Sequence, residues 1–363
     1  MKRRSTMAQF LALLLALILF ASPLLSVGVN AASSSPAAAQ TPRYRNVVYY
    51  GEWSIYAGQH QYYPSYIDGS QITHLNFAFV DVDASGNLVL CDEHADFQTV
   101  LPEQSGLTYG DPYAGVLGAM VLLRDKYPNM KIGISVGGWT RSGDFPKLAA
   151  SAATRTAFAK NISKFVDYLG FDFVDIDWEY PRTTDGTKQQ YEDFLLRLRR
   201  LLGGKLLTAA ILAGLDSKNE PIRSAAEAID SPAVELLDQI NLMTYDCDGP
   251  IHSSYAFAES CLNYWLEERH FPPEKLTLGL PFYGRPFPGA FKDLLLADPD
   301  ALEKDTVEMP QGSVHYNGRE TLTKKVALAK ERHLAGIMFW EISLDADDPQ
   351  KSLLKVLGEA MNA

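Results

Sequence analysis

The amino-acid sequence predicts an α/β fold, a single (β/α)8 barrel of the TIM type, and three observations lead to this prediction. The chain has 363 residues, which is long for one ordinary domain but typical of such a barrel. Hydrophobic residues make up 47% of the chain, enough for one large core. Short apolar runs rich in β-branched and aromatic residues alternate with longer helical patterns, which is typical of parallel βα units.

Eight segments of the sequence have the character of barrel strands. In chain order they are NVVYYGEW from Asn46, THLNFAFV from Thr73, KIGISVGG from Lys131, FDFVDIDWE from Phe171, LLTAAILA from Leu206, QINLMTY from Gln239, KLTLGLPFY from Lys275 and AGIMFWEI from Ala335. Helical patterns fill the intervals, for example at 114–126, 153–169, 189–202, 256–268 and 321–331. In such a barrel the chemistry takes place at the carboxyl ends of the strands, so we expect the candidate site residues there.

Residues 1–31 have the pattern of a secretory signal peptide, with three basic residues at 2–4, an apolar run and small residues up to Ala31. A retained membrane anchor is the alternative, because the apolar run nearly reaches spanning length. Residues 32–43 are of low complexity and predict a flexible leader to a catalytic domain at 44–363. We therefore expect a secreted, extracellular protein that is free of the membrane after signal cleavage.

The charge and the cysteines exclude several classes of function. Removal of the signal peptide takes away three positive charges, so the formal net charge moves from −11 to about −14. An acidic surface argues against nucleic acid as a partner but not against an uncharged polysaccharide. Cys91, Cys247 and Cys261 are too few for a disulfide framework, and the last two can either pair or remain buried thiols. We expect no metal and no cofactor, because no metal-ligand spacing or phosphate-binding glycine motif is present.

The most informative segment is FDFVDIDWEYP, from Phe171 to Pro181. A β-strand sends alternate side chains to opposite faces, so Asp175, Asp177 and Glu179 share one face. Three neighbouring acids repel one another and resist burial, so selection for folding alone would not retain them. A solvated edge strand is an alternative, but the intervening apolar residues fit it poorly. We interpret the row as part of an active site whose carboxyl groups hold different protonation states.

This segment resembles the DxxDxDxE signature of glycoside hydrolase family 18, the chitinase family, in which Asp172, Asp175, Asp177 and Glu179 fall in register. Four further segments are similar to other strands of that family, in the right order: SVGGW from Ser135, MTYD from Met243, LGLPFYGR from Leu278 and MFWE from Met338. The resemblance extends over most of the chain, from about residue 45 to 357, and implies a bacterial-type secreted chitinase.

The resemblance also implies the chemistry of the acidic row. Cleavage of a glycosidic bond needs an acid for the leaving oxygen, and Glu179 ends the row nearest the carboxyl end of the strand. We expect neighbouring carboxylates to raise the pKa of Glu179 and keep it protonated near neutral pH. In the family the substrate's own N-acetyl oxygen attacks the anomeric carbon, with retained configuration. Asp177 would orient the acetamido N–H and share a proton with Asp175, Tyr245 would hydrogen-bond the acetamido oxygen, and Glu179 would then activate water.

Further residues are candidates for binding the substrate. Met243 and Tyr245 are two residues apart, so both point inward, and Asp246 lies just beyond them, within reach of a sugar hydroxyl. Trp340 would form an apolar floor beneath the sugar, since flat aromatic faces suit the C–H face of a pyranose. Core positions are the alternatives for Tyr245 and Trp340. Tyr49 has the place of a first-strand tyrosine that lines the site in relatives.

Some candidates keep two interpretations. Arg285 can pair with a carboxylate or reach the substrate, and Trp53 and Trp139 can stack on outer sugars or simply pack. We assign supporting roles to four residues: Asp172, Ser135, Gly137 and Gly138. Ser135 would support the aspartate pair from the next strand, and the two glycines would allow close passage of the backbone.

Two features depart from the family pattern. Phe173 replaces the glycine that usually follows the first Asp of the motif, and we expect it to face the helical layer. Many relatives insert a small α+β domain after the seventh strand, but here only about 50 residues separate Tyr283 from Ile337. We expect no large insertion domain, a shallow cleft, and internal cleavage in preference to processive action.

Three functions are therefore compatible with the sequence. The first is a chitinase that binds and cleaves polymers of N-acetylglucosamine, acting as a monomer. The second is an endo-β-N-acetylglucosaminidase that acts on glycoprotein or cell-wall glycans. The third is a non-catalytic sugar-binding barrel, which the acid at Glu179 disfavours.

Overall fold

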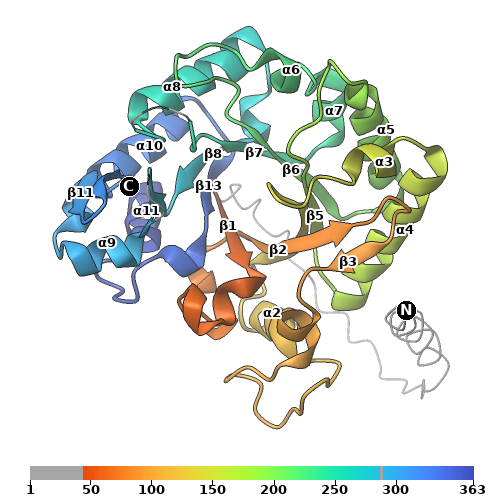
Figure 1. The fold of residues 1–363 in the computed structure, drawn as a ribbon, viewed down its shortest axis with the longest axis horizontal. Helices are drawn as coiled ribbons and strands as arrows, with labels where there is room; N and C mark the ends of the chain where they lie inside the picture. The colour runs from red at the N-terminus through yellow and green to blue at the C-terminus, as the bar shows by residue number, and fades with distance from the viewer. Residues whose placement is uncertain (1–43, 248, 250, 287–288) are drawn as a thin grey trace, which may run out of the picture. The chain divides into compact units, whose positions relative to one another are not determined.

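Eight parallel strands form a closed barrel in the computed structural model, which describes residues 44–247, 249, 251–286 and 289–363. The first strand pairs with both the second and the last, and these two ladders close the barrel. Figure 1 shows the strands at the centre and the helices around them. The predicted signal peptide at 1–31 and leader at 32–43 lie outside the described residues.

Each barrel strand coincides with one of the predicted runs, which confirms the predicted fold class. The strands are β1 (Arg45–Gly51), β2 (His74–Val82), β4 (Lys131–Gly137), β5 (Phe173–Asp177), β6 (Leu206–Leu212), β7 (Gln239–Met243), β8 (Leu276–Pro281) and β13 (Gly336–Trp340). A short strand, β3 (Leu88–Leu90), adds to β2 in the antiparallel direction.

The outer layer consists of helices that follow the strands. They are α2 (Gly115–Lys126), α3 (Phe145–Ala149), α4 (Ala152–Leu169), α5 (Thr187–Leu201), α6 (Arg223–Ala226), α7 (Ser231–Leu236), α8 (Tyr255–Asn263), α10 (Arg319–Glu331) and α11 (Leu353–Asn362). The longest, α4, begins where the Ser151 side chain accepts a hydrogen bond from the Thr154 N–H and ends at Gly170 with φ 66°. No helix within the described ranges is long and apolar enough to cross a membrane.

The two faces of β5 point to different surroundings. Val174 and Ile176 belong to the large apolar core between the barrel and the helices. Phe173 has the same parity along the strand as the two aspartates, so it faces the barrel interior. There its ring lies 5.8 Å from that of His74, and it fills the space beside Gly133, where a Cβ would come within 2.2 Å of the ring. The expectation that Phe173 faces the helical layer is therefore wrong.

The segment between β8 and β13 is short and contains no large domain among its described residues. It holds β9 (Tyr283–Gly284) paired with β10 (Gly289–Ala290), α9 (Phe291–Ala297), and β11 (Thr306–Met309) paired with β12 (Gly312–His315). Elsewhere, Cys261 carries a free thiol, so the possible disulfide with Cys247 is not formed.

Candidate active site

Asp175 lies in the barrel interior with both carboxyl oxygens satisfied. Its Oδ2 accepts hydrogen bonds from the hydroxyls of Tyr49 and Ser135, each at 2.8 Å. Its Oδ1 accepts from the Thr208 hydroxyl and from Asn241 Nδ2 at 3.4 Å. Burial raises the pKa of Asp175, and these hydrogen bonds act in the opposite direction. The four donors come from four other strands and fix the orientation of the carboxyl group.

Asp177, two residues further along β5, is also buried, but its hydrogen bonding differs. Its Oδ1 has no hydrogen-bond partner, although the side chain is only 4% exposed. Burial, Glu179 and Asp175 together raise its pKa well above the ordinary value. An acceptor that is buried without a donor is costly, so this atom is ready to accept an N–H from a ligand. The proton that Asp177 was expected to share with Asp175 stays a prediction.

Glu179 follows the end of β5, and the Ser142 hydroxyl holds its backbone. That hydroxyl accepts from the Glu179 N–H at 2.8 Å and donates to the Gly138 carbonyl at 3.0 Å. Burial raises the pKa of Glu179 to about 7, while a hydrogen bond with Tyr180 lowers it and the charge of Asp246 adds a smaller rise. The expectation that neighbouring carboxylates cause the shift is thus corrected, because burial is the larger cause.

Two glycines bring β4 unusually close to the end of β5. Gly137 and Gly138 have φ of 109° and 92°, a region that favours glycine. The Gly138 N–H donates to the Asp177 carbonyl at 2.7 Å, and a Cβ on Gly137 would lie 2.2 Å from the same oxygen. A side chain at Gly137 would push the two strands apart and displace the acidic row, and one at Gly138 would collide with the Phe79 ring.

An aromatic and apolar cluster lines the upper interior of the barrel beside the acids. Its members are Val47, Tyr49, Ala78, Phe79 and Met338, with Trp53, Met243, Tyr245 and Trp340 packed against them. The Tyr245 hydroxyl lies 3.9 Å from the Met338 sulfur. Trp340 stacks on Phe79 with ring centroids 5.4 Å apart and lies 5.5 Å from the Tyr49 ring. The structure therefore brings Tyr49, Met243, Tyr245 and Trp340 together.

Asp246 forms a charged site next to this cluster. Arg285 Nε donates to its Oδ1 at 2.8 Å, and the Tyr283 hydroxyl donates to its Oδ2 at 2.7 Å. Burial acts to raise the pKa of Asp246, but hydrogen bonds with His252, Arg285 and Tyr283 outweigh it and lower the pKa. Of the two interpretations of Arg285, the structure shows the pairing with a carboxylate.

Asp172 lies away from the other acids. It precedes β5 at the amino end of the strand, where its Oδ2 accepts from the Ile132 N–H at 2.9 Å. The expectation that every candidate lies at the carboxyl end is wrong for this residue, because Asp172 comes before all five residues of β5. Its contact joins two neighbouring strands.

Several residues of the site were not predicted. Tyr180 and Tyr283 belong to the motifs DWEYP and LGLPFYGR, but no role was predicted for either tyrosine. Thr208 and Asn241 are polar residues inside apolar strands, at inward positions that the two-residue period could have identified. Ser142 had no signal in the sequence, since it lies in the loop after β4.

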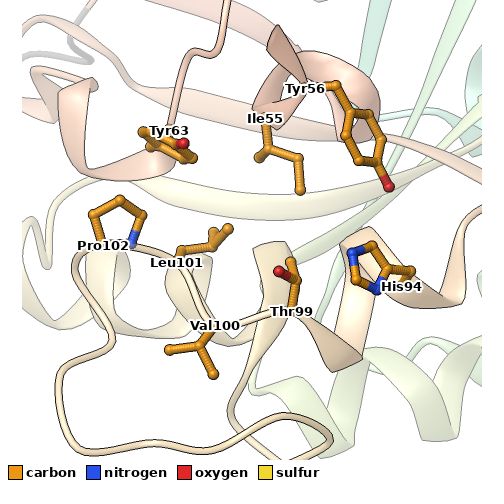
Figure 2. Close-up of a pocket in the computed structure, with 8 residues that line it drawn as sticks. All are labelled: Ile55, Tyr56, Tyr63, His94, Thr99, Val100, Leu101 and Pro102. Atoms are coloured by element: carbon orange, nitrogen blue, oxygen red, sulfur yellow. The ribbon is translucent and has the colours of Figure 1, made fainter.

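A separate groove of about 410 Å³ lies outside this site. Figure 2 shows it between the segments 55–63 and 94–102, lined by Ile55, Tyr56, Tyr63, His94, Thr99, Val100, Leu101 and Pro102. None of the acids described above lines the groove. The candidate site is therefore the acidic row in the barrel and not this surface groove.

The sequence and the fold are similar to those of known proteins. The model of the family described as Glycosyl hydrolases family 18 matches residues 45–345. Chitinase 1 of Aphanocladium album is 30% identical over 355 residues, which cover 83% of this chain and 81% of that protein. The GH18 chitinase ChiB from the chitin utilization locus of Flavobacterium johnsoniae covers 88% of this chain and 94% of its own, with 30% identity and a TM-score of 0.69. Chitinase ChiA74 from Bacillus thuringiensis, 24% identical, shares the fold with a TM-score of 0.74 over 88% of this chain and 70% of that one.

Proposed function

The chain belongs to glycosyl hydrolases family 18, and on this premise we propose that it hydrolyses the β-1,4 bonds between N-acetylglucosamine units of chitin. The observation that carries the proposal is the pair formed by Glu179 and Asp177. Glu179 has a pKa of about 7, as a proton donor at neutral pH requires. Asp177 offers a buried oxygen that lacks a donor, as the recognition of an acetamido N–H requires.

The reaction then follows from these groups. Glu179 gives its proton to the glycosidic oxygen while the carbonyl oxygen of the substrate's acetamido group attacks the anomeric carbon. The bond to the leaving sugar breaks, and a cyclic oxazolinium-type intermediate forms within the substrate. Asp177 accepts the acetamido N–H, with Asp175 behind it, and Tyr245 hydrogen-bonds the acetamido oxygen. Glu179 next takes a proton from water, which opens the ring and retains the configuration.

The remaining residues would bind the chain of sugars. Trp340 would form the floor under the reacting sugar, with Met243 and Tyr49 beside it. Asp246, held ionised by Arg285, would accept a hydrogen bond from a sugar hydroxyl. Trp53 borders Trp340, and Trp139 is 75% exposed, so both would stack on outer sugars.

The short segment after β8 also supports a proposal about where along the chain the enzyme cleaves. A cleft without a tall wall admits the middle of a flexible chain, so we propose cleavage at internal bonds by a secreted monomer. A time course on soluble chitin derivatives distinguishes the modes, because internal cleavage lowers viscosity before much reducing sugar appears.

The substrate can be tested with two glycans. The mature protein is incubated with chitin oligomers and, separately, with a high-mannose glycopeptide, and the products are read by mass spectrometry. Release of mostly chitobiose supports the proposal, whereas release of the intact glycan would favour an endo-β-N-acetylglucosaminidase. Absence of products from both would indicate a sugar-binding protein.

The mechanism has a test of its own. A chitin oligomer from which the N-acetyl group at the cleaved sugar has been removed should be inert, because it lacks the internal nucleophile. Efficient cleavage of this oligomer would contradict the proposed mechanism and leave the substrate class standing.

A further inference from the structure

The indole of Trp53 lies at the edge of the aromatic cluster, on the short helical turn η2 (Glu52–Ile55) that follows β1. Its ring centroid is 6.1 Å from that of Trp340 and 6.3 Å from that of Phe79. The ring also covers Gly51: a Cβ there would have its three nearest atoms in the Trp53 ring, at 2.4 to 2.9 Å. The absence of a side chain at Gly51 is therefore what allows the ring to lie in this place.

Arg141, from the loop after β4, packs on the same ring. Its guanidinium carbon is 5.9 Å from the centroid of Trp53 and 5.8 Å from that of Phe79. Its Nη2 donates to Glu52 Oε1 at 2.8 Å, and the Glu52 side chain is only 2% exposed. A buried carboxylate on the residue next to Trp53 thus holds the guanidinium in place against the ring.

We propose that Gly51, Glu52 and Arg141 are positioning residues that fix the Trp53 indole as a wall for an outer sugar, one that lies beyond the two sugars of a disaccharide bound over Trp340. The proposal rests on the proposed function, since a chain of N-acetylglucosamine units is the ligand. A wall that is ordered before binding spares the entropy of ordering it on binding, so long oligosaccharides bind more tightly. The three residues would therefore set the preference for substrate length and leave the bond-breaking step unchanged.

Two substitutions move the ring by independent means. Gly51→Ala adds a methyl group beneath the indole, and because Gly51 has φ −77° the backbone accepts alanine without strain. Arg141→Met removes the guanidinium that packs on the ring. Gly143→Ala is the matched control, because a Cβ there meets nothing within 4 Å.

The measurement compares a long and a short substrate. With the hexamer of N-acetylglucosamine, both variants should raise KM about tenfold, equivalent to about 1.4 kcal/mol, and kcat should stay within about twofold. With a nitrophenyl glycoside of the disaccharide, KM and kcat should both stay near the wild-type values. Gly143→Ala should match the wild type on both substrates.

A double-mutant cycle separates positioning from a general structural role. In a Trp53→Ala background, Gly51→Ala and Arg141→Met should have no further effect on the hexamer. An effect that persists without the indole, an equal loss on both substrates, or an unchanged KM for the hexamer would overturn the proposal. If Arg141→Met does not fold, the result with Gly51→Ala decides. A wild-type protein inactive on both substrates would overturn the proposed function as well.

Discussion

Two aspartates on β5 lie in contrasting surroundings. Asp175 is in the middle of the strand, in what we call the lower region of the barrel interior, and Asp177 is at the carboxyl end, in the upper region. Asp175 is 0% exposed and Asp177 4% exposed, so burial does not distinguish them. Asp175 receives four hydrogen bonds from Tyr49, Ser135, Thr208 and Asn241, whereas Asp177 Oδ1 receives none. The difference lies in the hydrogen-bond donors: it predicts that the contacts of Asp175 support the barrel around it, and that Asp177 Oδ1 is available to a ligand.

The same contrast separates the two acids outside the strand. Burial raises the pKa of Glu179 to about 7, while the hydrogen bonds at Asp246 lower its pKa below the ordinary value. Below about pH 7 one side of the site therefore holds a proton that it can donate, and the other holds a negative charge. Substitutions in the upper region should affect turnover, and substitutions in the lower region should affect stability.

The largest expected effect is that of Glu179→Gln. It removes the proton donor and keeps the shape of the side chain, so kcat should fall by about 10³-fold or more. The Kd for a chitin oligomer, measured by calorimetry, should stay within about threefold. A parallel loss of binding would mean that the variant is misfolded and that the role of Glu179 is unproven.

Asp177→Asn should cost nearly as much turnover. The amide would place a donor or a weaker acceptor where the acetamido N–H is to be received, and kcat should fall by about 10² to 10³-fold. The melting temperature should not fall, because Oδ1 makes no hydrogen bond in the free protein and the surroundings already disfavour the charged form of Asp177. A strong fall in melting temperature would place Asp177 with the structural acids and abolish the contrast.

Asp175→Asn tests the lower region. An amide nitrogen at either oxygen position would face donor groups, so the protein should lose about 1 to 3 kcal/mol of unfolding free energy. Chemical denaturation of this variant and of Asp177→Asn, under the same conditions, measures the difference. Equal stability of the two variants would show that the hydrogen bonds of Asp175 do not support the barrel.

The smallest expected effect concerns pH. The folded-state pKa of Glu179 is raised from 4.5 to about 7, so its contribution to stability is complete below pH 4.5 and lost as the pH rises through 7. Glu179→Gln should therefore be more stable than the wild type at pH 8, by roughly 1 to 2 kcal/mol after allowance for partial exposure, and similar to it at pH 4. Wild-type kcat/KM should fall above about pH 7, as the acid loses its proton. A gain in stability that is independent of pH would contradict the assigned pKa.

Much of the fold was predictable because it depends on local pattern. The eight apolar runs, the helices between them and the shared face of Asp175 and Asp177 all follow from periodicity along the chain. The same rule, applied consistently, also places Phe173 on the inner face. Its assignment to the helical layer was wrong because it disregards this parity, and the ring instead fills the space beside Gly133.

Other features were not predictable because they join loops that are distant in the sequence. Ser142 holds the backbone of Glu179, and Arg141 pairs with Glu52 across 89 positions. Nothing in the spacing of these residues indicates that they meet. Their contacts depend on how the loops after β1, β4 and β5 lie over the barrel.

By itself, the sequence determined which residues are acids, the face of the strand they occupy and the order of strands that surrounds them. Only the tertiary structure decided which acid is satisfied and which is not. The donors to Asp175 lie on four other strands, from Tyr49 on β1 to Asn241 on β7. The pKa of a buried carboxyl group depends on burial and on such donors, and both arise only when the barrel closes.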